Sequence, residues 1–486
     1  MPLSSSTTSR DLQYTSLNDY SRAERNVISK KASTFILIAK LIYFCVGING
    51  ACARSFLAIF LKHAELSYIS IGIYFAVTSA AIAITTPLFG ILIEHTRLFS
   101  FFLRLLSVLS VVASIFLLVQ FFAYDDTIQS NYSIFHDIKL WLDGILPVSG
   151  YNVETKRLWY LTTAGVLLSS FGRASGSVRD SAVMDVCKNS PSNNFTYDRV
   201  RGVLSLGMGL SNIGCGAVLV YTNLKDYELW SFSTLALIVL TIFSFPFSSI
   251  WELNFKKQTE ELAEDEVNGD DNNRASNVNN DISATMCEKM FRLISSYTMI
   301  VFLLVSVVNG MGNATYDIYI ILRLNQLHAS YFLIGVTAGL GSLTNFVFFY
   351  ITPCIRTKIG NSWMIIISML AFCVRSWIYS LMNDTNYSIV LIAQSLHGLN
   401  FSIMFAGSIG YINEKTRNNG LTVFARAMFG FAFTGIGGIV GNLLGGYLYD
   451  IHGAVYMFRV KVYITLIVMI LFVISEWTNI FSVQKR

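Results

Sequence analysis

The amino-acid sequence predicts an all-α membrane protein with twelve transmembrane helices arranged in two six-helix bundles. Of its 486 residues, 53% are hydrophobic and only 13% are charged, and the mean hydropathy is +0.53. A soluble domain carries about 25% charged residues to cover its surface. Here the charged residues lie between long apolar runs, which excludes a soluble globular protein.

The apolar runs have the length of membrane spans. A helix needs roughly 20 apolar residues to cross a bilayer. Runs of this kind lie at 35–60, 68–93, 99–122, 158–184, 201–221, 229–250, 296–320, 331–352, 362–382, 387–411, 421–448 and 455–476. The first run is too long for the core of a signal peptide, so we expect it to remain as the first span.

One long polar segment, 252–290, divides the spans into six and six. It is acidic and rich in Asn, with too few apolar residues to form a core, so we expect a disordered cytosolic linker. This division is typical of proteins built from two helical repeats. The predicted domains are a disordered cytosolic tail at 1–33, an N-terminal bundle at 34–251, a C-terminal bundle at 291–478 and a cytosolic tail at 479–486.

The distribution of Lys and Arg predicts the orientation. Most of them fall on one side of the predicted spans, the side that also holds both termini, and positive charge marks the cytosolic face. The outer loops then contain the sequons at Asn131, Asn383 and Asn386, which we expect to be glycosylated. We expect the plasma membrane as location. The net charge of +5 reflects this topology and does not indicate a nucleic-acid partner.

Charged residues inside membrane helices are costly and usually face a water-filled cavity. Arg54 and Arg173 lie deep in their spans, whereas Lys40 lies near an end from which it can reach the interface. Arg173 and Asp180 are seven positions apart, so they share one face of a helix. They either line the cavity together or form a charge pair that only stabilises the helix.

The C-terminal half has its own set of polar residues. Asp317 is predicted to neutralise Arg375 across this bundle, which would itself be a structural role. Gln394, His397 and Asn400 follow one another at intervals of three, so they form a polar stripe on an otherwise apolar helix. Such a stripe faces a partner helix or the cavity.

After the second span the sequence contains Gly90, followed by Glu94 and Arg97, which we interpret as a gating loop. A glycine permits close helix contact, and the acid can pair with a base in only one conformation. Further landmarks are Tyr197-Asp-Arg199-Val-Arg201, Thr315-Tyr316-Asp317, Leu340-Gly-Ser342-Leu-Thr-Asn345, Val374-Arg375, Gln394-Ser-Leu-His397-Gly-Leu-Asn400 and Gly446-Tyr-Leu-Tyr449-Asp450.

In their order and spacing these motifs resemble the lactose permease-like branch of the major facilitator superfamily, and among its members the animal major facilitator superfamily domain-containing protein 6-like orphans. The resemblance covers all twelve predicted spans and implies the major facilitator fold. It implies that Arg201, Arg375 and His397 keep basic or titratable residues of the permease site.

The departures from the permease concern four positions. The resemblance places the proton-carrying acid of the permease at Asn400 and its sugar-binding acid at Ser342, its aromatic platform at Met208 and a basic residue at Gln394. Galactoside binding and proton coupling by the permease's route are therefore not expected. A cavity that contains Arg54, Arg201, Arg375 and His397 but few acids favours an anionic or polar organic solute.

A ridge of glycines in the eleventh predicted span, Gly437, Gly441 and Gly445, predicts a close helix contact or a sliding surface between moving bundles. The leading hypothesis is a secondary transporter that works by alternating access, with a small-molecule solute and the lipid bilayer as partners. The alternative is a non-transporting receptor or scaffold with the same fold. The sequence indicates no enzyme, cofactor, metal site or oligomeric state, and it is compatible with a monomer.

Overall fold

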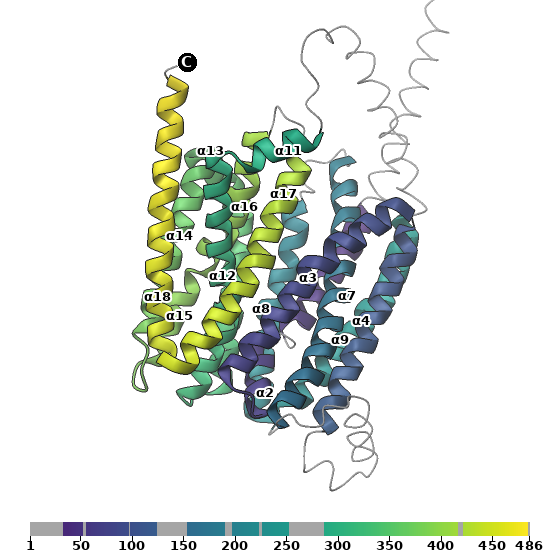
Figure 1. The fold of residues 1–486 in the computed structure, drawn as a ribbon. Helices are drawn as coiled ribbons and strands as arrows, with labels where there is room; N and C mark the ends of the chain where they lie inside the picture. Colours follow the sequence, from purple (N-terminus) through teal and green to yellow (C-terminus); the bar gives the residue numbers. More distant parts are fainter. Residues whose placement is uncertain are drawn as a thin grey trace, which may run out of the picture.

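The computed structural model describes residues 33–51, 55–96, 98–123, 153–189, 197–222, 226–251, 286–416 and 421–484, and these ranges contain helices and turns but no strand (Figure 1). The predicted N-terminal tail up to residue 32, the loop that contains Asn131 and residues 252–285 of the predicted linker lie outside the described residues.

In the first half of the chain, the described residues form six long helices. They are Ser33–Ala51, which the short helix α2 (Leu57–His63) follows, α3 (Tyr68–Thr96), α4 (Phe99–Ala123), α7 (Val153–Asn189), α8 (Tyr197–Tyr221) and α9 (Asp226–Trp251). Pro87 and Pro246 lie inside α3 and α9 without ending them. Proline is tolerated in membrane helices because neighbouring groups satisfy the freed carbonyls.

The second half forms a corresponding set. It comprises α11 (Met286–Ile294), α12 (Tyr297–Gln326), α13 (Tyr331–Ile359), α14 (Asn361–Ser380), η2 (Tyr387–Ile389), α15 (Val390–Ser395), α16 (His397–Thr416), α17 (Thr422–Gly430), η3 (Phe431–Ile436) and α18 (Gly437–Gln484). Ser296 and Ser330 cap α12 and α13, because their side chains accept hydrogen bonds from the backbone N–H three residues later. Gly453, with a φ of 80°, separates the last two spans inside α18.

Each predicted span corresponds to a helix. Nine stretches of the described residues are long and apolar enough to cross a membrane, and the ninth, Phe424–Thr478, contains two predicted spans. The two remaining spans are α7, which carries several charged residues, and α9, whose apolar stretch Thr234–Ile250 is shorter. The all-α membrane fold with twelve spans therefore agrees with the structure.

The boundary of the predicted linker needs correction. Residues 286–290 were expected to be disordered, but α11 begins at Met286. Met286, Met290, Leu293 and Ile294 lie at helical spacing, so this segment has one apolar side that a count of its polar residues does not reveal.

The hydrophobic core that contains residues of both bundles lies at one end, whereas α8 and α13 stay in contact further along, at Gly202 with Phe346 and at Arg199 with Tyr350. We call this end, which bears α2 and lies at the bottom of Figure 1, the α2 end, and we call the opposite end, where α18 finishes, the C-terminal end. The shared core contains residues of both halves, such as Phe56, Leu161, Tyr316, Tyr319 and Phe458. Towards the C-terminal end each bundle has a separate core, around Tyr43 and Phe247 in the first and around Phe302 and Phe472 in the second.

Small residues bring the bundles together. A Cβ added to Gly216 of α8 would lie 2.9 Å from the Cα of Gly335 in α13, and a Cβ on Gly446 of α18 would lie 2.8 Å from the backbone oxygen of Tyr68 in α3. Such close backbone approach is typical of membrane helix contacts. Towards the C-terminal end α3 and α17 diverge (Figure 1), and a Cβ at Gly90 would meet no atom within 4 Å.

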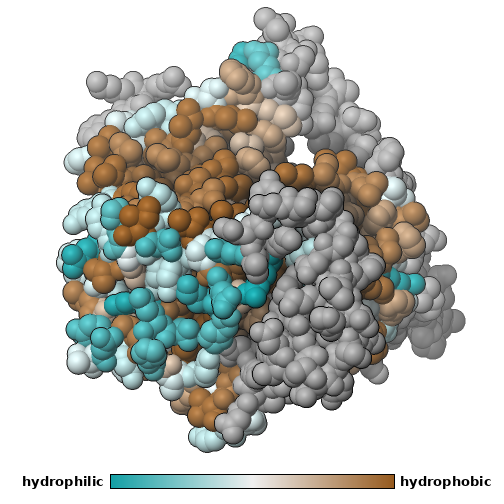
Figure 2. All heavy atoms as spheres, turned by 60° about the horizontal axis from the view of Figure 1, so that its bottom comes forward, coloured by the Kyte–Doolittle hydropathy of each residue, from teal (hydrophilic) through white to brown (hydrophobic). Residues whose placement is uncertain are grey.

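The outer surface fits a lipid environment. Large apolar side chains are exposed along the helices, among them Ile91 on α3 and Ile467 on α18. Figure 2, which brings the α2 end forward, shows hydrophilic residues gathered at this end beside a broad apolar surface. Lipid can contact such a surface because the helices satisfy their own backbone hydrogen bonds.

Candidate substrate and coupling site

Arg375 of α14 is the centre of a buried polar cluster in the second bundle, and its side chain is only 1% exposed. Its Nη1 donates a hydrogen bond to Asn400 Oδ1 at 3.1 Å, and its Nη2 donates to Tyr379 Oη at 3.0 Å and to Gln394 Oε1 at 3.3 Å. The guanidinium carbon lies 4.8 Å from the centre of the Tyr316 ring. All these contacts of Arg375 are with neutral groups.

The polar stripe of Gln394, His397 and Asn400 is buried as predicted, although the helix that carries it is interrupted between α15 and α16. Arg375 joins the first and third members of the stripe. His397 stacks on Phe401 with 6.1 Å between the ring centres, and its Nδ1 has no hydrogen-bond partner among the described residues. Gly341 of α13 makes room for the stripe, because a Cβ there would lie 2.9 Å from Gln394 Oε1.

The predicted pairing of Asp317 with Arg375 is not found among the contacts of Arg375. Asp317 follows Tyr316, whose ring faces the guanidinium, and successive helix positions differ by about 100°. The carboxylate therefore leaves the helix in another direction than that ring, and its charge acts on Tyr379, which accepts a hydrogen bond from Arg375. Asp317 is half-buried and makes other interactions within the described structure.

A second buried cation, Lys461 of α18, lies on the same tyrosine. Its Nζ lies 5.4 Å from the centre of the Tyr316 ring and 5.8 Å from that of Phe458. The side chain is 1% exposed, and no described group accepts a hydrogen bond from it. A buried ion without a counter-ion costs several kcal/mol, whereas a desolvated cation–π contact returns only about 2 kcal/mol. The contacts with these two rings therefore do not offset the desolvation cost of a charged Lys461.

The sequence interpretation did not single out Lys461. The sequence does indicate a buried charge at this position, because Lys461 falls inside the predicted span 455–476 and lies eight positions after Gly453. At about 1.5 Å per residue it lies roughly 12 Å along the helix from that turn. An Arg at position 459 is exposed beside Trp377, which shows that neighbouring cations of one helix can have opposite environments.

The first bundle holds its charges differently. Asp180 of α7 accepts a hydrogen bond of 2.5 Å from Tyr43 Oη and lies 3.9 Å from Arg201 Nη2 of α8. These charged side chains are 23% and 40% exposed. The Arg201 guanidinium also lies 5.8 Å from the centre of the Phe405 ring in the second bundle. This cluster therefore connects three helices of one bundle with the other bundle.

Two arginines next to this cluster face in different directions. Arg173, predicted to share a face with Asp180, is exposed and makes interactions of its own. Arg179 is buried, and its Nε and Nη1 have no acceptor among the described residues. The hydrogen bond and the ion pair of Asp180 come from Tyr43 and Arg201, which lie on other helices than its own.

The gating-loop and glycosylation residues are only partly described. Arg54, Arg97 and Asn131 lie outside the described residues, as does the side chain of Glu94. Gly90 was expected to permit a close helix contact, but nothing lies within 4 Å of a Cβ placed there, because α3 diverges from α17 at this end. Asn383 and Asn386 are exposed in the turn after α14, where they hydrogen-bond to each other's backbone.

The glycine ridge of α18 serves two contacts. A Cβ at Gly437 or Gly441 would lie 2.7 Å or 2.6 Å from a backbone oxygen of α12, within the second bundle. The adjacent Gly438 faces Ser79 of α3 and Gly446 faces Tyr68, across the two bundles. The ridge therefore combines packing inside one bundle with a contact surface between bundles.

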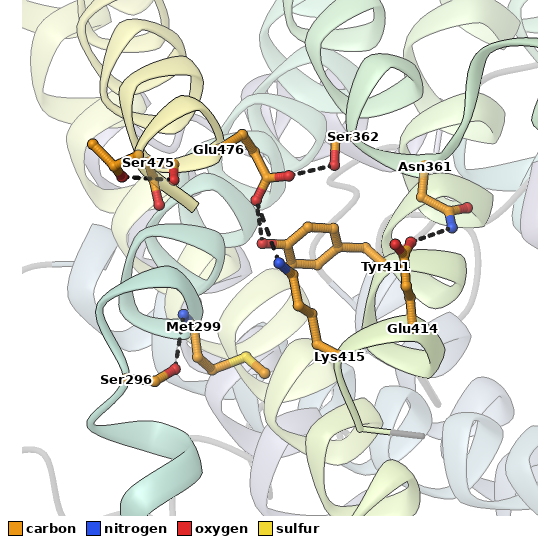
Figure 3. Close-up of polar contacts among 10 residues, drawn as sticks. Ser296, Met299, Asn361, Ser362, Tyr411, Glu414, Lys415, Ser475 and Glu476 are labelled. Atoms are coloured by element: carbon orange, nitrogen blue, oxygen red, sulfur yellow. Dashed lines mark hydrogen bonds and ion pairs between the residues drawn. The ribbon is translucent and has the colours of Figure 1, made fainter. Parts of the chain in front are cut away.

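Polar contacts tie each bundle together at the C-terminal end. Glu476 of α18 accepts hydrogen bonds from Tyr411 of α16 and Ser362 of α14, both at 2.7 Å, and lies 3.9 Å from Lys415 Nζ (Figure 3). In the first bundle Arg104 of α4 donates to two adjacent serines of α9, Ser248 at 2.8 Å and Ser249 at 2.7 Å. Both bundles are thus joined internally at the end where their cores are separate, an arrangement suited to rigid-body movement.

The sequence matches the MFS_1 like family over residues 36–460, which is most of the chain. The chain belongs to this family of the major facilitator superfamily. It is therefore an integral, multi-pass membrane transporter rather than an enzyme. Membership favours the predicted transporter over the receptor or scaffold alternative. No curated protein matches the chain.

Solved structures confirm the fold of this MFS_1 like protein. It is similar to the nucleoside transporter NupG, with a TM-score of 0.64, 11% identity and coverage of 91% of this chain and 98% of that one. A point mutant of NupG gives a TM-score of 0.67 at 11% identity, with 91% and 99% coverage. At this identity the likeness concerns the fold alone.

Proposed function

We propose that this transporter moves a small polar or anionic organic solute by alternating access, as a member of the lactose permease-like branch. Substrate would bind near the midplane between the bundles, where transporters of this architecture have their sites. The shared core closes the α2 end, and the cores separate towards the C-terminal end. With both termini in the cytosol, this conformation faces the cytosol.

One observation carries the choice of solute: Arg375 and Lys461 are both buried against the ring of Tyr316, and their other contacts are neutral or apolar. An anionic group is the partner that such an interior lacks, because buried charges are stable only when paired. Gln394 and Asn400 add amide groups that can bind polar substituents. NupG is a transporter of nucleosides, which are polar organic solutes, and its fold is compatible with the same general class.

The proposed orientation has its own support. The excess of Lys and Arg places both termini in the cytosol, and the exposed Asn383 and Asn386 are then on the outer side at the α2 end. In cells, glycosidase treatment should shift the electrophoretic mobility of the protein, and replacing Asn131, Asn383 and Asn386 together with Gln should abolish the shift. The chain has another sequon, Asn194-Phe-Thr196, on the predicted cytosolic side, and glycan on Asn194 instead would reverse the orientation.

Uptake into proteoliposomes tests the solute class. We expect accumulation of a radiolabelled small carboxylate, with lactate and benzoate as probes, to exceed that of the neutral nucleoside uridine. Arg375→Gln should reduce carboxylate uptake at least tenfold in protein that remains folded. Arg459→Gln, which removes an exposed cation from the helix that carries Lys461, is the matched control and should leave uptake unchanged. Uptake of uridine alone, insensitive to Arg375, would overturn the anionic assignment.

A further inference from the structure

Lys461 shares the Tyr316 ring with Arg375 in the proposed solute site, but unlike Arg375 it makes no hydrogen bond within the described structure. Its Nζ is enclosed by the rings of Tyr316 and Phe458 and has no hydrogen-bond acceptor in the described structure. The amine is therefore sealed from water in the conformation whose α2 end is closed.

The groups around Lys461 come from three helices. From α12, Tyr316 faces the amine, and Asp317 is the next residue along that helix. From α14, Arg375 lies on the Tyr316 ring and Tyr379 contacts Phe458, with 5.3 Å between the ring centres. From α18 itself, Phe458 completes the enclosure. The cationic neighbour disfavours a second positive charge, and a tyrosine ring offsets only part of the lost hydration.

The two cations differ in what they can do. Arginine keeps its proton in proteins, whereas a buried lysine readily becomes a neutral amine. Lys461 can lose its charge and Arg375 cannot. The burial of both side chains against Tyr316 is therefore explained if Lys461 is a neutral amine in this conformation. A proton reaches such a site without needing a cavity large enough for a solute.

We propose that Lys461 is the proton-binding site of the transport cycle, so that the coupling ion is H⁺. The proposal rests on the proposed function, because it assigns the coupling of the same carrier. When the α2 end is open and an anionic solute enters, the amine takes one proton from the aqueous phase and becomes an ammonium group. It returns this proton after the solute leaves towards the cytosol, which gives the neutral amine of the present conformation. One proton and one monovalent anion then cross together without net charge.

The first test is the pH dependence of thermal unfolding of the purified full chain in detergent. A lysine that is neutral in the folded state and protonated in the unfolded state makes the unfolded state bind more protons, so stability rises with pH. The folding equilibrium constant should therefore change by up to tenfold per pH unit in the wild type. Lys461→Met should remove this dependence, and Lys461→Arg should be less stable than the wild type at every pH.

Lys62→Met is the matched control for this experiment. Lys62 also lies over a tyrosine ring, 4.3 Å from the centre of Tyr68, but it lies at the α2 end and donates a hydrogen bond to the backbone oxygen of Leu66. Replacing Lys62 should leave the change of stability with pH the same as in the wild type. Parallel curves for the wild type and Lys461→Met would overturn the proposal. Should the Met variant fail to fold, Lys461→Gln serves the same comparison.

A second test separates the coupling from the choice of solute. Proteoliposomes that contain a pH-sensitive dye report proton entry when lactate, benzoate or uridine is added outside. We expect proton entry with the carboxylates in the wild type, and in Lys461→Met exchange of carboxylate without proton entry. Undissociated acid also carries protons across the lipid, so protein-free liposomes give the background; proton entry above this background that persists in Lys461→Met would overturn the proposal. If no probe is transported but the Lys461-dependent pH slope is present, the proposed solute class fails and the proton site stands.

Discussion

In the first bundle a carboxylate lies between its partners: Asp180 accepts a hydrogen bond from Tyr43 and lies 3.9 Å from Arg201. In the second bundle Arg375 and Lys461 lie against neutral amides and aromatic rings, almost without exposure. Asp180 and Arg201 balance each other's charge and contact the other bundle, although the adjacent Arg179 is buried and its Nε and Nη1 have no acceptor among the described residues. The second has an excess of positive charge that a bound anion or loss of a proton can balance.

This difference suggests separate roles. Contacts of Arg201 span the two bundles at the end where their cores have separated, so they depend on the relative position of the bundles. Contacts of Arg375 lie inside one bundle and persist when that bundle moves as a body. We therefore assign conformational sensing to the Asp180 cluster and solute or proton binding to the Arg375 and Lys461 cluster.

The largest expected effect concerns the two arginines. Arg375→Gln leaves buried acceptors on Asn400, Tyr379 and Gln394 that the shorter side chain cannot all reach, so we expect a loss of roughly 3 kcal/mol in the free energy of unfolding. Arg201→Gln removes a partly exposed ion pair and should cost less than about 1 kcal/mol. Thermal unfolding of both variants measures the contrast. Equal losses would contradict the distinction between the two clusters.

Substitutions of the glycines in α18 can distinguish contacts within the second bundle from contacts between the two bundles. Gly437→Ala forces a methyl group against the backbone of α12 and should destabilise the second bundle by about 1–3 kcal/mol. Gly446→Ala meets the backbone of α3 instead and should open the α2 end. Mass spectrometry of maleimide labelling can follow this opening at Cys215, a buried cysteine of the shared core. Faster labelling in Gly437→Ala than in Gly446→Ala would contradict this assignment.

For the hydrogen bonds that join helices at the C-terminal end, we predict a moderate effect on stability. Glu476→Gln weakens hydrogen bonds to a charged acceptor from Tyr411 and Ser362, and we expect a loss of about 1–2 kcal/mol. Arg104→Lys in the first bundle replaces two directed donors by one ammonium group and should cost about 1 kcal/mol. Chemical denaturation of each variant in detergent measures the values. No loss in either would show that these contacts do not hold the bundles together.

The smallest effect is expected at the α2 end, at Glu154 near the start of α7. Hydrogen bonds from the backbone N–H of Ser67 at 2.9 Å and from Ser70 Oγ at 2.7 Å lower the pKa of Glu154. A lowered pKa in the folded state contributes stability above the ordinary value of 4.5, and this contribution is lost as the pH falls through the folded value. Glu154→Gln should therefore lower the midpoint of thermal unfolding by a few degrees at pH 7 and should match the wild type near pH 3. A difference that grows on acidification would contradict this role.

The sequence predicted the helices better than the contacts between them. The spans follow from apolar length, and the buried stripe of Gln394, His397 and Asn400 follows from helical spacing. The pairing of Asp317 with Arg375 stays a prediction, because position along a helix does not give the direction in which each side chain points. Lys461 was not singled out although it lies inside a predicted span, and only the packing of Tyr316 and Phe458 shows that it is enclosed.

The gating role of Gly90 illustrates a different limit. A contact that forms in only one state cannot be recognised in a structure of the other, and here Gly90 has no neighbour within 4 Å. Its predicted role therefore stays a prediction for the state in which the C-terminal end closes. The glycine ridge shows the opposite case. Sequence spacing alone does not say which helix each glycine contacts, and only the structure shows that the ridge faces two helices.

Distance measurements at both ends of the reconstituted protein test the central claim, alternating access, most directly. Spin labels on Cys substitutions of Thr222 and His452 report the α2 end, and labels on Cys substitutions of Gly90 and Gly430 report the C-terminal end; each pair spans the two bundles. We predict a population with a short distance at the α2 end and a long one at the C-terminal end, as in the present structure. A second population should show the reverse, and a transported carboxylate should shift the balance between the two. A single unchanging distance at both ends would contradict alternating access and would favour a non-transporting role for this fold.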